Sequence, residues 1–76
     1  MTVSDLEQLL VARLVRERSG TSQTWRRALG KIIVRDMTTH AHCNWDVTPG
    51  GTDAQRVAIE ELLDDVRLKH SIVTPG

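Results

Sequence analysis

The densest group of ligand-type side chains lies in the segment from His40 to Asp46. Imidazole, thiolate and carboxylate groups are ligands of zinc and similar ions. His40 and His42 are two apart, so on a strand they share one face, and Asp46 lies further along it. Cys43 points to the opposite face unless the segment is a loop, and His70 would approach from elsewhere in the fold. The segment is a candidate zinc site, although a polar hairpin face with a buried cysteine explains the same residues and is the favoured interpretation.

Cys43 is also the single thiol of the chain. A catalytic thiol needs a base within hydrogen-bond reach and surroundings that favour the thiolate. The adjacent His42 points to the other side of a regular strand, and only the fold decides whether His40 or His70 approaches. Because a small buried cysteine is the commoner arrangement, we expect a protein that is not an enzyme.

A second cluster is basic and lies earlier in the chain. Arg26, Arg27, Lys31 and Arg35 are close in sequence, with Trp25 beside them. Cationic side chains can follow a phosphate backbone while an indole stacks on a base. No nucleic-acid-binding motif accompanies them, and a chain with two tryptophans as its only aromatic residues is expected to bury them. Nucleic-acid binding is therefore an alternative hypothesis.

The first element that must position these residues is a helix, predicted over residues 5–18. Ser4 and Glu7 have the spacing of a capping box, and Gly20 is placed to end the helix. A ridge of leucines spaced by four is expected to face the core.

Val11 and Val15 form a second ridge on this helix, turned by about 100° from the leucines. One small sheet is not expected to cover both ridges. We therefore predict that Val11 and Val15 contact a second copy of the chain.

Residues 21–30 fit a short helix ending at Gly30 or an extended segment, and the helix is favoured. Consecutive β-branched residues predict a strand from Lys31 to Met37. Alternation predicts a second strand from His42 to Thr48, antiparallel to the first. Its two faces would carry Cys43, Trp45 and Val47 on one side and His42, Asn44, Asp46 and Thr48 on the other.

A proline-glycine turn precedes the last predicted helix. Thr52 and Gln55 form another capping box, and the apolar spacing predicts a helix that ends near Lys69 or His70. The acidic residues of this helix are interpreted as its solvated back; they are Glu60, Glu61, Asp64 and Asp65. Residues 71–74 fit either a short third strand or a packed tail.

The order of these elements predicts one α+β domain over residues 1–76, with a small antiparallel β-sheet packed against N- and C-terminal helices. A two-stranded hairpin is marginal alone. A third strand could come from residues 71–74, from residues 21–28, or from a second copy of the chain, and the sequence leaves these alternatives open.

The composition is that of a small folded protein, with 39% hydrophobic and 26% charged residues. One cysteine excludes an internal disulfide. No apolar run reaches the roughly 18 residues of a membrane span, and the N-terminus lacks the pattern of a secretory signal. We expect a cytoplasmic protein.

The charge is uneven although the formal net charge is zero. Residues 1–35 hold seven basic and three acidic side chains, a net +4, and residues 36–76 hold three basic and seven acidic, a net −4. This asymmetry can orient the chain against a charged partner or let one copy meet another head to tail.

Together these observations favour a non-catalytic interaction module without a cofactor, whose partner is a second copy of itself or another protein. One alternative is a zinc-binding domain that uses the segment from His40 to Asp46. The other is a nucleic-acid-binding module that uses the basic cluster from Trp25 to Arg35.

Overall fold

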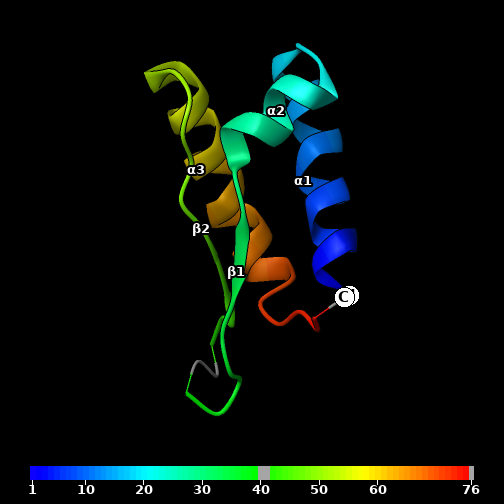
Figure 1. Cartoon of the computed structure of the whole chain (residues 1–76), viewed down its shortest axis with the longest axis vertical. Coiled ribbons are helices and arrows are strands. Elements are labelled where there is room, and N and C mark those ends of the chain that lie inside the picture. Colours follow the sequence, from blue (N-terminus) through cyan, green and yellow to red (C-terminus); the bar gives the residue numbers. More distant parts are fainter. Residues whose placement is uncertain (40–41, 76) are drawn as a thin grey trace.

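The computed structural model describes residues 1–39 and 42–75, which form three helices with a two-stranded antiparallel hairpin between them (Figure 1). In chain order the elements are α1 (Val3–Arg18), α2 (Ser22–Leu29), β1 (Ile32–Val34), β2 (Trp45–Val47) and α3 (Asp53–Lys69). In Figure 1, α1 and α3 run along the long axis, and α2 lies near the upper end of α1. The predicted α+β fold is confirmed.

The α1 helix begins two residues before the predicted start. Thr2 is its N-cap: the Thr2 hydroxyl accepts from the Asp5 N–H, and the Asp5 carboxylate accepts from the Thr2 N–H, each at 3.1 Å. The predicted capping box of Ser4 and Glu7 is therefore wrong. Helix α1 ends at Arg18, because Ser19 already has a positive φ of 64°.

The short helix favoured for residues 21–30 is confirmed. The Thr21 hydroxyl accepts from the Thr24 N–H at the start of α2, and Gly30 ends the helix with a φ of 70°. The left-handed region that Gly30 occupies is accessible to glycine at little cost. The buried face of α2 consists of Trp25, Ala28 and Leu29.

The hairpin is shorter than the alternation predicts. Strands β1 and β2 pair with Ile32 opposite Val47 and Val34 opposite Trp45. Regular pairing ends early because the Asp36 side chain accepts from the Thr38 N–H, which starts a turn within the stretch predicted as strand.

The last helix follows its prediction closely. The Thr52 hydroxyl accepts from the Gln55 N–H at 3.1 Å and the Gln55 side chain accepts from the Thr52 N–H at 2.9 Å. Helix α3 ends at Lys69, with His70 as its C-cap. Its buried stripe comprises Ala58, Ile59, Leu62, Leu63 and Val66.

Of the two structures expected for residues 71–74, the packed tail is the one observed. Val73 is buried, and the Thr74 carbonyl accepts from the Val3 N–H at 3.0 Å, beside a parallel bridge between Thr2 and Thr74. Within the described residues the sheet has two strands.

Asn44 holds this tail, which corrects its predicted place on the polar face of the hairpin. Its side chain is only 2% exposed. The Asn44 Nδ2 donates to the Val73 carbonyl at 2.7 Å, and its Oδ1 accepts from the Val73 N–H at 2.9 Å. The alternation of residues within a strand cannot show that Asn44 is buried by Val73, which lies 29 residues later in the chain.

Both tryptophans belong to the core, and each indole N–H has a partner. Trp25 donates to the Ser19 carbonyl at 2.7 Å, and Trp45 donates to the His70 carbonyl at 2.8 Å. These bonds remove the cost of burying the polar end of each ring. None of the helices in the part of the chain described here has both the length and the apolar character needed to cross a membrane.

Candidate interaction surface

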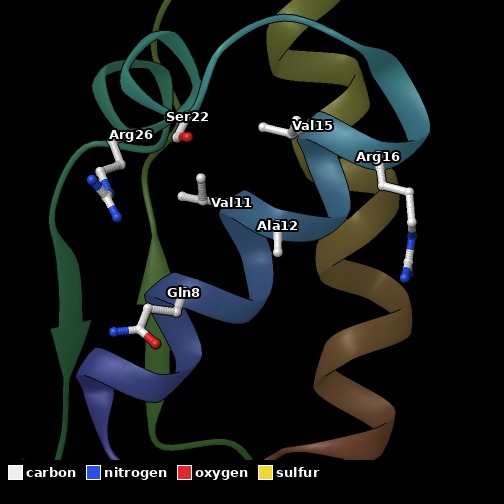
Figure 2. Close-up of a pocket in the computed structure, with 7 residues that line it drawn as sticks. All are labelled: Gln8, Val11, Ala12, Val15, Arg16, Ser22 and Arg26. Atoms are coloured by element: carbon white, nitrogen blue, oxygen red, sulfur yellow. The ribbon is translucent and has the colours of Figure 1, made fainter.

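A shallow groove of about 390 Å³ lies between α1 and α2, and we call it the α1–α2 groove. Figure 2 shows the side chains that line it. They are Gln8, Val11, Ala12, Val15, Arg16, Ser22 and Arg26. The predicted interaction residues Val11 and Val15 both belong to this set.

The apolar part of the groove is built from three small or medium-sized side chains of α1, Val11, Ala12 and Val15. Val11 is only 4% exposed and forms the floor, while Ser22 and Arg26 of α2 line the opposite side. Val15 is half-buried and Ala12 is exposed, so these two present the accessible apolar atoms. The sequence analysis expected both valines of the second ridge to be open to a second copy. In the structure Val11 is buried within its own chain, and Val15 remains partly accessible.

The rim of the groove is basic. Arg16 and Arg26 lie on opposite sides of the two valines in Figure 2. Each is exposed and has one loose ion pair: Arg16 with Glu17 at 3.9 Å and Arg26 with Glu7 at 3.4 Å. Exposed pairs of this kind contribute little to stability, so both guanidinium groups can turn toward an anionic partner.

A tighter set of ion pairs joins α1 to α3. The Arg13 guanidinium donates to Asp65 and to Glu17, each at 2.8 Å, and Lys69 lies 3.3 Å from Asp65. Donation from Arg13 and Lys69 lowers the pKa of the Asp65 carboxyl. The bond between Arg13 and Asp65 also raises the pKa of Arg13. Part of the sequence's charge asymmetry is therefore neutralised inside the molecule.

The outer face of α3 carries a feature that the sequence analysis missed. Val57 is 53% exposed and Leu68 is 87% exposed. Eleven residues at 3.6 per turn place these two side chains within about 20° of each other around the helix. Three acidic residues lie on the same exposed face: Glu60, Glu61 and Asp64. The spacing of Val57 and Leu68, opposite the buried stripe, is the signal that could have found this face.

The predicted metal ligands do not come together among the described residues. His42 is exposed, and the Cys43 thiol donates to the Trp45 carbonyl at 3.3 Å. Asp46 accepts from Arg67 at 2.7 Å and pairs with Arg35 at 3.7 Å. Within residues 1–39 and 42–75, no three His, Cys, Asp or Glu side chains could share an ion.

Two further histidines complete the predicted metal set. His40 lies outside the described residues. His70 is half-buried and ends α3, where its carbonyl accepts from Trp45.

The predicted nucleic-acid residues are split between separate places. Trp25 is buried, so its indole ring is not presented to a base. Arg26, Arg27 and Lys31 are exposed, but Arg35 lies on the hairpin beside Asp46. The exposed basic side chains could still contact phosphates, but the Trp25 indole is not available to stack on a base.

Comparison of the chain with protein-family models, with curated proteins and with solved structures found no match.

Proposed function

We propose that this chain is a small, non-catalytic interaction module that self-associates through the α1–α2 groove. The observation that carries the proposal is the pair Ala12 and Val15, whose apolar atoms are open above the buried Val11, between Arg16 and Arg26. An apolar centre with a polar rim is the usual anatomy of a protein interface.

The size of the molecule indicates a weak association. A standard interface covers about 800 Å² on each partner, which is about one sixth of the 4849 Å² surface of this chain. The groove and its rim make up only part of such an area. We therefore expect a concentration-dependent complex in the micromolar range or weaker, not an obligate one.

The contacts of the nucleophile candidate also favour a non-catalytic role. The Cys43 thiol is half-buried, packs against the core and donates to a backbone carbonyl. A nucleophilic thiol needs a base within hydrogen-bond reach, whereas the hydrogen-bond partner of this thiol is the backbone carbonyl of Trp45.

Sedimentation velocity from about 10 µM to about 1 mM tests the proposal, because a weak complex assembles in this range. We expect the average mass to rise with concentration. Ala12→Arg should abolish the rise, since Ala12 is exposed and a larger cation fills the groove without disturbing the core. Val11→Asp is unsuitable because it would bury a carboxylate.

Met37→Asp is the matched control, because Met37 is an exposed hydrophobic residue of the hairpin turn and does not line the groove. It should leave the rise unchanged. A wild-type chain that stays monomeric up to about 1 mM would overturn the proposed function.

A further inference from the structure

We infer that the occupant of the α1–α2 groove is the outer face of α3 from a second copy of the chain, so that copies join head to tail. This inference rests on the proposed self-association and adds the identity of the partner surface. We call the exposed residues Val57, Glu60, Asp64 and Leu68 the α3 stripe.

The apolar part of the argument begins with Leu68. It is the most exposed of the large hydrophobic side chains described, at 87%. The described residues leave most of Leu68 uncovered, and no residue of α3 lines the groove. An exposed leucine on one surface and an apolar recess on another are complementary features that one molecule cannot satisfy by itself.

The dimensions of the two surfaces also agree. Val57 and Leu68 lie about 16 Å apart along α3, at 1.5 Å per residue. The groove extends along α1 from Gln8 to Arg16, about 12 Å. A helix laid along the groove can therefore place Leu68 over Val15 while the acidic residues of the stripe meet the rim.

Charge supplies the direction of the pairing. Among the residues that the structure describes, Glu60 and Asp64 have no ion-pair partner, in contrast to Glu61, which pairs with Arg18. The groove rim presents Arg16 and Arg26. An acidic stripe attracts a basic rim, whereas a groove facing its own copy would bring two basic rims together.

Pairing between two different surfaces has a defined consequence for assembly. Each copy offers one groove and one stripe, so the contact is heterologous. Such contacts build either a closed ring or an open linear oligomer. Species larger than a dimer are therefore expected as the concentration rises.

A mixing experiment tests this inference with two variants that each block one surface. Ala12→Arg fills the groove, and Leu68→Lys places a cation in the stripe. Both positions are exposed, so both variants should keep the wild-type circular dichroism and thermal midpoint. Each variant alone should be monomeric at a concentration at which the wild type associates.

An equimolar mixture of the two variants should form a one-to-one heterodimer and nothing larger. The Leu68→Lys chain keeps its groove and the Ala12→Arg chain keeps its stripe, so one intact contact remains. Native mass spectrometry, with one variant labelled with ¹⁵N, identifies this species directly.

The outcomes separate this inference from the proposed function. A monomeric wild type overturns both. Wild-type assembly that is lost in Ala12→Arg but retained in Leu68→Lys refutes the stripe and leaves the groove as a surface that pairs with itself. A mixture of two monomeric variants that yields no heterodimer also refutes the head-to-tail pairing.

Salt provides a second and independent readout. Raising the salt concentration to about 1 M shortens the screening length to about 3 Å. Two exposed ion pairs across the contact are then lost, which should weaken wild-type association roughly two- to thirty-fold. Association that strengthens or stays unchanged at high salt would contradict the pairing of the acidic stripe with the basic rim.

Discussion

Replacing Asn44 with alanine should release the C-terminal tail and destabilise the whole fold. Asn44 satisfies both backbone groups of Val73 through bonds of 2.7 and 2.9 Å, and both side chains are 2% exposed. Leaving a buried donor or acceptor without its partner costs about 1–3 kcal/mol for each group. Because water can enter the space left by the amide, we expect a total loss of about 2–4 kcal/mol.

That loss is large for a chain of this length. At about 0.05–0.15 kcal/mol per residue, 76 residues give a total unfolding free energy of about 4–11 kcal/mol. Urea unfolding followed by the fluorescence of Trp25 and Trp45 measures the change. Both rings are buried, and a slope of about 1–2 kcal/mol/M predicts a midpoint lower by about 1–4 M.

His42→Ala is the control, because His42 lies in the same segment and is exposed. It should change the unfolding free energy by less than about 0.5 kcal/mol. An Asn44→Ala chain that is as stable as this control would refute the reasoning. It would mean that the Val73 backbone groups reach water, or that the tail contributes nothing to the cooperative unit.

Acid should weaken the link between α1 and α3, because Arg13 lowers the pKa of Asp65. A carboxyl whose folded-state pKa is lowered stabilises the fold above its ordinary pKa of about 3.9, and this contribution is lost as the pH falls through the lowered value. We expect the unfolding free energy to decrease from about pH 5 to about pH 2, with a shallower decrease in Asp65→Asn; equal slopes would contradict this assignment. At the other end of α3, Thr52→Ala removes the N-cap and should cost about 1 kcal/mol in thermal or urea unfolding. Thr52→Ser keeps the capping oxygen and should stay near wild type, so two variants of equal stability would argue against the cap.

Local signals explain why the helices could be predicted from the sequence. The hydroxyls of Thr21 and Thr52 cap α2 and α3, and Gly30 ends α2. Each of these signals involves residues within three or four positions of one another, so it can be recognised in the sequence without knowledge of the fold.

The start of α1 could not be predicted in the same way. Two overlapping capping boxes compete there, and the structure selects the one that begins at Thr2. The Val3 N–H lies in the first turn, where a helix provides no acceptor of its own. It donates instead to the carbonyl of Thr74. A contact between residues 71 positions apart thus accompanies the earlier start, and no local pattern contains it.

The same limit applies to the candidate site. Helical spacing identified Val11 and Val15 as one ridge, and both line the groove. It could not show that the fold would bury Val11 to 4% exposure, because the way helices pack on one another is set by tertiary structure. The alternation that located Trp45 and Val47 in the core likewise failed at Asn44, where the covering segment comes from the C-terminal tail.

The pairing of the two ends of the chain has a consequence for how the protein can be rewired. The Thr74 N–H donates to the Met1 carbonyl, and the two ends meet beside the start of α1 in Figure 1. Segments paired in this way lie about 5 Å apart. A linker of a few residues could therefore join them, and a circular permutant opened at the exposed turn around Thr38 would keep every helix intact. Because the two ends are close together, the whole chain could also be inserted into a loop of a host protein without moving the two sides of that loop apart.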